Sequence, residues 1–396
     1  MSYLKNNVKS DCCGCSACND ACPVNCIEMK TDKKTFFKYP VVDKSKCINC
    51  LKCEKVCPVT FSEQIKNKLN DDKAYAVFSK NSELIYESSS GGAFSMIMDD
   101  FSNRFKDNFA IFGAAFEGFD VVLKGVTTMH EAKAFKKSKY VQATCDGAYK
   151  YAKKLLDSGS AVLFSGTPCI VAALKTFLGR DYDKLYTVDI VCHGVPNNEI
   201  FKMYLNDVEK KYGDTLKSFS FRVKKNFDTD ECNTRTVDLE FENKTVNLDI
   251  KNCEYLYSFH NAYCMRPSCH ECRFATPERV SDITLADFWG INKKYSFINE
   301  QRGVSMLRIN TQKGKTFMGF INENSEVYES EYSFAVECNE QLRRPMAYNI
   351  RTDKFYKLIN KGVSFSDAVS ICKKQKIKIY HRVLWKIKNL MRNISK

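Results

Sequence analysis

Residues 12–23 read Cys-Cys-Gly-Cys-Ser-Ala-Cys-Asn-Asp-Ala-Cys-Pro, and residues 47–58 read Cys-Ile-Asn-Cys-Leu-Lys-Cys-Glu-Lys-Val-Cys-Pro. Each stretch holds three cysteines separated by two residues, then a fourth cysteine directly before a proline. The pattern C-x2-C-x2-C-x3-C-P therefore occurs twice. Cysteines clustered at this density, in a chain without a disulfide framework, bind metal or carry redox chemistry. These two stretches decide what the N-terminal residues fold around.

The doubled pattern is typical of bacterial two-cluster ferredoxins, which hold two [4Fe-4S] clusters. Three closely spaced thiolates wrap one cluster, and the cysteine before proline reaches the other. A pair of zinc knuckles is disfavoured, because zinc sites usually pair two C-x2-C units. Residues 1–62 are thus predicted to form a small ferredoxin domain. We expect two interleaved ligand sets, Cys12, Cys15, Cys18 and Cys57 for cluster I and Cys47, Cys50, Cys53 and Cys22 for cluster II.

Composition sets the wider limits. The chain has 396 residues, 44% of them apolar, and 20 cysteines. Wholesale disorder is excluded by that apolar content. No apolar run is long enough for a membrane-spanning helix, and no secretory signal is recognised, so we expect a cytoplasmic protein in a reducing compartment. The net charge of +14 favours an anionic partner or surface, although no nucleic-acid-binding module accompanies it.

Two cysteines and one basic hairpin remain inside the ferredoxin domain. We interpret Cys13 as a spare thiol and Cys26 as a small packing residue. Residues 27–46 are predicted to form a hairpin that links the two cluster motifs. This hairpin is rich in lysine, which is explained equally well by ordinary solvation and by a docking face for an acidic electron-carrier protein.

The rest of the chain alternates strand and helix patterns after a polar linker at residues 62–73. This alternation predicts α/β layers, so the fold class is a small ferredoxin domain fused to a larger α/β module with a mixed sheet. We divide that module into residues 74–180 and 181–345, followed by a basic helical tail at 346–396. Expected elements include a helix at 93–105, a hairpin at 109–126, and strands at 161–164 and 185–191, each followed by a helix.

Three features of the module carry chemistry. Ser90-Gly91-Gly92 opens a helix, and Ser165–Cys169 forms a strand–turn–helix; small residues at such places let backbone N–H groups meet a phosphate. For the first feature, a helix cap with a tight turn is the favoured explanation. The third feature is a second cysteine group, Cys264, Cys269 and Cys272, together with Cys169 and Cys192 at strand ends. Four thiolates drawn from these five predict a third cluster or a zinc ion.

These motifs, taken together, resemble the coenzyme F420 hydrogenase/dehydrogenase β-subunit family. More closely, the chain is similar to the bacterial branch that joins a two-cluster ferredoxin to this module, over about residues 1–345. The resemblance rests on six stretches: Ser90-Gly91-Gly92, Lys139-Tyr140-Val141-Gln142, Ser165–Cys169, Asp189–Gly194, Cys269-x2-Cys272, and the run Ser281-Asp-Ile-Thr-Leu-Ala-Asp-Phe-Trp-Gly290.

The resemblance implies FAD and a third [4Fe-4S] cluster in the module. The implied cluster ligands are Cys169, Cys192, Cys269 and Cys272, with Cys264 as the runner-up. The implied flavin contacts are Ser90, Gly91, Gly92, Lys139, Tyr140, Gly166 and Thr167.

The resemblance further implies an iron–sulfur flavoprotein oxidoreductase. Such a protein passes electrons between clusters, FAD and a two-electron partner. That partner is coenzyme F420 or an organic substrate. Polysaccharide biosynthesis is one setting in which such a substrate would occur. One alternative is a ferredoxin-type electron carrier without its own substrate chemistry. The other is a non-redox interaction protein with structural zinc.

Proton donors and the C-terminus complete the predictions. His193 is the leading catalytic candidate, ahead of His270 and Asp287, although a purely structural role fits each. Arg266 and Arg279 are interpreted as neutralising the thiolate-rich site, as gripping phosphate, or as surface residues. Residues 373–396 read as a basic amphipathic helix, which predicts peripheral contact with the inner membrane face or packing on its own domain.

Overall fold

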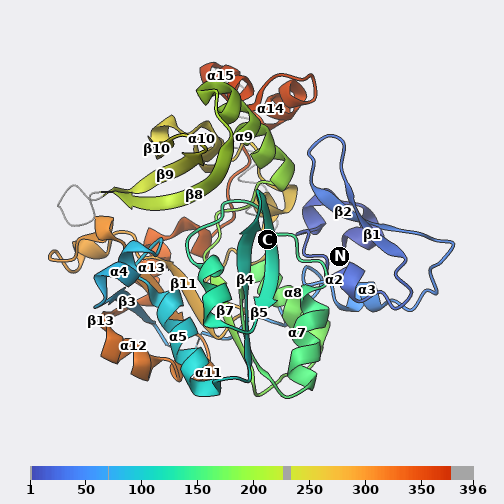
Figure 1. The fold of residues 1–396 in the computed structure, drawn as a ribbon. Coiled ribbons are helices and arrows are strands. Elements are labelled where there is room, and N and C mark those ends of the chain that lie inside the picture. Colours follow the sequence, from blue (N-terminus) through green and yellow to red (C-terminus); the bar gives the residue numbers. More distant parts are fainter. Residues whose placement is uncertain (1, 70, 226–232, 376–396) are drawn as a thin grey trace.

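The computed structural model describes residues 2–69, 71–225 and 233–375. A mixed eight-stranded sheet forms its centre, with strand order β13-β3-β12-β11-β7-β6-β4-β5 (Figure 1). The predicted fold class, a small ferredoxin domain on a larger α/β module with a mixed sheet, is confirmed. The strands of this sheet are β3 Lys73–Ser79, β4 Phe109–Glu117, β5 Asp120–Val126, β6 Ala161–Gly166, β7 Leu185–Ile190, β11 Ile283–Asp287, β12 Ser305–Ile309 and β13 Ser325–Glu331.

The middle of the sheet is parallel. Strand β6 pairs in parallel with β4 and β7, and β7 pairs in parallel with β11. The flanking strands β5, β12, β3 and β13 run antiparallel to their neighbours. Residues 161–165 of β6 are all buried, as expected for a strand covered on both faces. The C-terminal ends of β6, β7 and β11 therefore meet at one edge, where α/β folds place their functional loops.

Helices cover both faces of the sheet. One face carries α5 (Ala93–Phe105) and α12 (Met318–Asn324), and the other carries α7 (Ala148–Asp157) and α8 (Pro168–Leu178) (Figure 1). The predicted helix at 93–105 and the predicted hairpin at 109–126 are observed with these bounds. Helix α8 begins at Pro168. The first turn of a helix tolerates proline, because a backbone N–H at that position would have no partner within the helix.

A second, antiparallel sheet lies above the first, with strand order β10-β9-β8. Its strands are β8 Leu216–Lys225, β9 Asn233–Phe241 and β10 Thr245–Asp249. Helices α9 (Asn198–Tyr212), α10 (Glu254–His260), α14 (Thr352–Ile359) and α15 (Phe365–Lys374) pack with it around an aromatic core. The Asn197 side chain caps α9 by accepting a hydrogen bond from the backbone N–H of Ile200 at 2.9 Å.

The N-terminal domain stands at the side of the module, next to α7 and α8 (Figure 1). It contains the hairpin β1 (Ile27–Thr31) and β2 (Lys38–Val42), as expected for the segment between the two cysteine motifs. Its hydrophobic core is continuous with that of the module: Ala17 and Val56 pack with α7 and α8, while Phe37 and Tyr39 pack with α9 and α10. The ferredoxin domain is therefore built into the fold rather than tethered to it.

Short helices complete the chain. The α-helices are α1 Tyr3–Asn6, α2 Ala17–Asp20, α3 Lys52–Lys55, α4 Ser82–Tyr86, α6 Met129–Ala132, α11 Gln312–Lys315 and α13 Tyr332–Cys338. The 3-10 helices are Lys9–Asp11, Lys133–Phe135, Ile250–Asn252, Pro267–Glu271, Ile291–Lys293, Glu300–Arg302 and Glu340–Leu342.

The predicted linker at residues 62–73 and the predicted tail at 346–396 both contact the rest of the module. In the polar stretch at 62–73, the backbone N–H of Asn67 donates to Arg279 and its side chain donates to Ser281, both at 2.7 Å. Helices α14 and α15 belong to the core around α9 and α10. Most of the predicted basic amphipathic stretch, residues 376–396, lies outside the described residues. Within the described ranges, no helix is both long and apolar enough to cross a membrane.

Candidate iron–sulfur and flavin site

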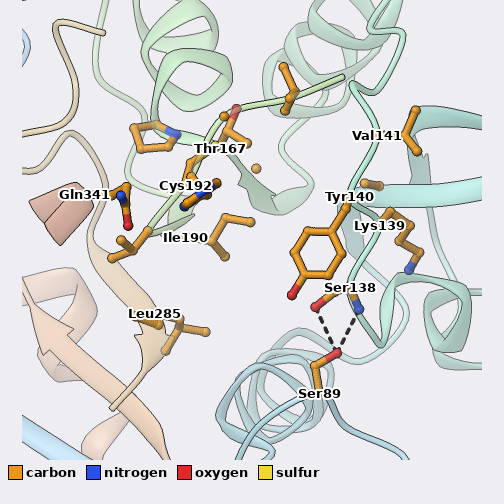
Figure 2. A pocket seen from close by; sticks show the side chains of 18 of the residues that line it. Ser89, Ser138, Lys139, Tyr140, Val141, Thr167, Ile190, Cys192, Leu285 and Gln341 are labelled. Atoms are coloured by element: carbon orange, nitrogen blue, oxygen red, sulfur yellow. Dashed lines mark hydrogen bonds between the residues drawn. The ribbon is translucent and has the colours of Figure 1, made fainter. Parts of the chain in front are cut away.

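A cavity of about 930 Å³ opens at the sheet edge where β6, β7 and β11 end (Figure 2). Its walls include five loops, residues 88–92, 136–143, 165–169, 190–195 and 268–275, together with residues of other elements. Every predicted flavin contact except Gly91 lines it, and so does the predicted catalytic residue His193. Residues far apart in the sequence thus meet in one place, because parallel strands end at the same edge.

The four cysteines implied as ligands of a third cluster all line this cavity. Cys169 follows β6, Cys192 follows β7, and Cys269 and Cys272 lie in and after the 3-10 helix Pro267–Glu271. Burial raises the pKa of Cys192 to about 12, and the neighbouring thiols of Cys169 and Cys272 add to the rise. The pKa of Cys269 is also raised, first by burial and then by the neighbouring thiols of Cys192, Cys272 and Cys169. Like charges that raise one another's pKa indicate thiols held close together.

The runner-up ligand, Cys264, is placed elsewhere. Its side chain is buried in the aromatic core, where its sulfur lies 3.3 Å from the hydroxyl of Ser258. Across the described ranges, no three Cys, His, Asp or Glu side chains converge as ligands of a single ion do. The potential ligands that these cavity cysteines offer are all thiolates, the donor type that suits iron–sulfur clusters or zinc.

The loop at 88–92 joins the cavity wall to the sheet. Ser89 accepts hydrogen bonds from the backbone N–H and the hydroxyl of Ser138, at 2.8 and 3.0 Å, so two walls are tied together (Figure 2). The hydroxyl of Ser90 is buried in the cavity wall and has no hydrogen-bond partner among the described residues. An orphaned hydroxyl at this position fits a bound polar ligand.

Gly91 has a packing role. A Cβ there would lie 2.1 Å from the carbonyl oxygen of Val77 in β3, and its N–H donates to the hydroxyl of Ser305 in β12 at 3.0 Å. Gly92 has φ of 89°, a conformation that favours glycine, and it starts α5. The two glycines therefore press the loop against the sheet and set the position of Ser90.

Lys139 and Tyr140 continue the wall that includes Ser138, across the cavity from Ile190 and Cys192 (Figure 2). The ammonium of Lys139 donates to the carbonyl oxygens of Ala134 and Lys136, at 2.7 and 2.6 Å, so it closes its own loop. Burial lowers the pKa of Lys139 to about 7. The ring of Tyr140 packs against the ring of Phe259, with centroids 4.8 Å apart.

His193 lies on the wall that follows β7. Its ring packs on Phe259, and burial lowers its pKa below the ordinary value of 6.5. The Nε2 atom is buried and has no hydrogen-bond partner within the described part of the chain. The other two proton-donor candidates are engaged: His270 Nδ1 lies 3.0 Å from the carbonyl oxygen of Met346, and Asp287 forms an ion pair with Arg222.

Arg279 does not face a phosphate. It forms a fully buried ion pair with Asp189 at 2.8 Å, with side-chain exposures of 1% and 0%. It also donates to the carbonyl oxygen of Phe274 at 3.1 Å. Asp189 lies in β7 shortly before Cys192, and Phe274 follows Cys272, so this pair fixes the spacing of two cysteine loops.

Contacts among the ferredoxin cysteines connect the two cysteine motifs in space. Burial raises the pKa of Cys18, and the thiols of Cys12 and Cys57 add to the rise. Cys57 is thus beside the first cysteine motif, as the interleaved ligand pattern predicts. On the other side, Cys22 packs with a set that includes both motifs: Cys18, Cys26, Cys47 and Cys53. The backbone N–H of Cys26 donates to the sulfur of Cys22 at 3.2 Å.

Two residues lie at the border between the domain and the module, a position that sequence reasoning assigned to neither of them. Cys13, interpreted as a spare thiol, lines the cavity. A hydrogen bond between the thiols of Cys13 and Cys169 raises the pKa of Cys169, and the Cys13 thiol also forms a hydrogen bond with Cys15. Cys12 has extended backbone angles, so neighbouring side chains point to opposite sides. The Cys12-Cys13 doublet was the available signal. The second residue is Arg266, which is buried against Cys12.

Comparison with known proteins agrees with this architecture. Residues 11–61 match the model of a 4Fe-4S dicluster domain. The chain is therefore an iron–sulfur protein of the oxidoreductase, electron-transfer class. Residues 159–333 match the model of the C-terminal domain found in the β subunits of coenzyme F420 hydrogenase/dehydrogenase. Residues 159–333 thus resemble the C-terminal domain of that family and follow an N-terminal 4Fe-4S dicluster domain, so the resemblance stated from the sequence is confirmed.

Several solved structures are also similar to the chain. One of the matching chains belongs to the F420-reducing [NiFe] hydrogenase complex from Methanosarcina barkeri, studied by xenon derivatization. The match has a TM-score of 0.43 and 14% sequence identity, and it covers 76% of this chain and 90% of that one. No curated protein matches the chain.

Proposed function

We propose that this protein is an iron–sulfur flavoprotein oxidoreductase that moves electrons between its [4Fe-4S] clusters, FAD and a two-electron partner. The partner is coenzyme F420 or another organic substrate. One observation carries the proposal: a single cavity is lined by the four thiols Cys169, Cys192, Cys269 and Cys272 and by the three loops that hold the predicted flavin contacts. A cluster and a flavin held there would be neighbours.

The cavity fits a flavin in size and in chemistry. Its volume of about 930 Å³ lies within the usual range for cofactor pockets. It offers the unpartnered hydroxyl of Ser90 and the start of α8 at Gly166 and Thr167, where backbone N–H groups favour an anionic phosphate. A bound flavin would accept single electrons and pass them on as a pair. The residues of this chain would hold it and keep water from the cluster side.

His193 supports the chemistry as a proton donor. Reduction of an organic substrate by two electrons also consumes protons. The Nε2 atom of His193 lies in the cavity wall and, within the described residues, has no partner. Burial lowers the pKa of His193 below the ordinary value of 6.5, so the ring is mostly neutral at pH 7 and takes up the proton that it would donate at more acid pH. Arg222, paired with Asp287 on the same wall, supplies a buried cation beside the site.

Electrons would be delivered by an acidic one-electron carrier protein at the cluster II side of the ferredoxin domain. Cys50 is exposed there, and its neighbours Ile48 and Leu51 are 61% and 54% exposed. Exposed lysines flank this cysteine motif in the sequence, and charge of that sign steers an acidic protein toward it. The lysines are Lys44, Lys46, Lys52 and Lys55.

The test is cofactor content after anaerobic purification. The proposal requires about 12 iron and about 12 sulfide per chain, for three four-iron clusters, together with about one FAD. Substitution Cys269→Ser should remove about four iron and leave the spectrum of the other clusters unchanged. Cys264→Ser is the matched control, because that thiol lies outside the cavity and should cost no iron.

A ferredoxin-type electron carrier is the alternative function. About eight iron without flavin would contradict the proposal and indicate such a carrier. Stoichiometric zinc in place of the third set of iron atoms would indicate a structural site. Equal iron loss in the two cysteine variants would show that the cavity thiols hold no cluster.

A further inference from the structure

Arg266 belongs to the module but reaches into the ferredoxin domain. Its backbone N–H donates to Val195 at 3.0 Å, in the loop that follows Cys192. Its side chain is 1% exposed and crosses the domain border. There the guanidinium donates from Nε to the carbonyl oxygen of Cys12 at 2.7 Å, and from Nη2 to the sulfur of Cys12 at 3.4 Å. Cys12 is a predicted ligand of cluster I.

The other contacts hold the guanidinium in one position. Nη2 also donates to the carbonyl oxygen of Lys38 at 2.9 Å, and Nη1 donates to the side-chain oxygen of Gln142 at 3.1 Å. The rings of Tyr39 and Phe37 lie over it, with centroids 4.6 and 5.2 Å from its central carbon. A cation fixed by hydrogen bonds and aromatic faces needs no rearrangement when charge nearby changes.

No carboxylate forms an ion pair with Arg266 among the residues that the structure describes. Isolated buried charges are costly, so a buried cation normally meets a counter-charge. In this site that role falls to Cys12, which carries negative charge as the thiolate of a cluster. The same buried guanidinium therefore faces the cluster I ligand directly.

We infer that Arg266 raises the reduction potential of cluster I through its charge and its hydrogen bond to the sulfur of Cys12. When cluster I takes up one electron from a low-potential donor, the cluster with its thiolates becomes more negative by one unit. A fixed cation stabilises that reduced form more than the oxidised form, and hydrogen bonds to the sulfurs are among the known determinants of such potentials. The inference rests on the two-cluster ferredoxin domain, not on flavin chemistry.

Two references are built into the chain. Cluster II serves as an internal reference for the reduction potential, because its predicted ligand Cys22 accepts a hydrogen bond from the backbone N–H of Cys26 and not from an arginine. Arg273 is the matched control, since it also bridges the module and the ferredoxin domain. It donates to the carbonyl oxygen of Val59 at 3.2 Å and pairs with Asp11 at 3.3 Å. It thus shares the border position of Arg266, but its partners are oxygens.

The test compares the full-length protein with Arg266→Gln, Arg266→Lys and Arg273→Gln, all purified anaerobically. Iron and sulfide are counted first, and each cluster is then titrated with dithionite and followed by electron paramagnetic resonance. We expect Arg266→Gln to shift the reduction equilibrium of cluster I about tenfold toward the oxidised form, which is about 59 mV for one electron. Arg266→Lys keeps the charge and should shift it less. The reduction potential of cluster II should stay unchanged in both Arg266 variants, and that of cluster I should stay unchanged in Arg273→Gln.

The outcomes separate cleanly. Unchanged cluster I potentials in both Arg266 variants would overturn the inference, as would an equal shift in Arg273→Gln. If Arg266→Gln loses cluster I, Arg266→Lys decides, because a retained charge should keep the potential near that of the parent chain. A parent chain without two ferredoxin clusters would instead contradict the domain assignment itself, which is a different failure.

Discussion

Replacing Arg279 by alanine should destabilise the protein strongly. The variant leaves Asp189 as a buried, unpaired carboxylate, because that side chain has 0% exposure and its Oδ2 already has no hydrogen-bond partner among the described residues. Removing one partner of a buried ion pair costs about 3–5 kcal/mol. The Arg279 side chain also donates to the carbonyl oxygens of Phe274 and Thr276, at 3.1 and 3.3 Å. We therefore expect a loss near the upper end of that range.

The assay is urea unfolding of the anaerobic holoprotein, followed by circular dichroism, with the free energy of unfolding compared between variants at constant slope. The matched control is Arg180→Ala, which removes an exposed ion pair to Asp157 at 3.0 Å, with side-chain exposures of 64% and 39%. Exposed pairs contribute about 0–1 kcal/mol. If Arg279→Ala and Arg180→Ala differ by less than about 1 kcal/mol, the reasoning about the buried pair is refuted.

Three further predictions concern packing, docking and proton transfer. Gly91→Ala should unfold or strongly destabilise the chain, since its Cβ would strike a strand, whereas Gly319→Ala in α12, with nothing within 4 Å, should be neutral or stabilising; thermal shifts compare the two. Lys52→Glu should slow reduction by an acidic flavodoxin at low salt more than Lys154→Glu on α7, and equal rates would contradict docking at cluster II. Because burial lowers the pKa of His193, its protonated fraction grows as pH falls, so substrate reduction should rise toward acid pH; His193→Gln should lose that dependence in kcat/KM profiles.

Local patterns in the sequence predicted most of the fold. The spacing of the cysteines specified two interleaved ligand sets, and the structure brings Cys57 beside Cys12 and Cys18. Helix α9 was predicted from its Asn197 cap, and α5 from its apolar periodicity after two glycines. These features depend on neighbours a few residues away, which is why a single sequence reveals them.

The features that the sequence did not reveal depend on contacts between distant residues. Arg266 and Cys12 are 254 positions apart, and nothing near either residue predicts that they meet. Gly91 resembled a phosphate-binding glycine, but its closest neighbours come from β3 and β12. Cys13 looked redundant because the ferredoxin pattern was complete without it. Its position beside Cys169 follows only from how the domain is set into the module.

That setting has a consequence for how the proposed electron path responds to its surroundings. Cys12, a predicted ligand of cluster I, lies at a border in which Arg266, Tyr39 and Cys13 are packed, whereas Cys50, a predicted ligand of cluster II, is exposed to solvent. Delivery from a carrier protein at cluster II is an encounter between charged surfaces, which salt screens over about a Debye length. Transfer from cluster I into the module crosses a buried, fixed contact, where salt screens little. Ionic strength should therefore act on the first step of the path and leave the internal steps unchanged.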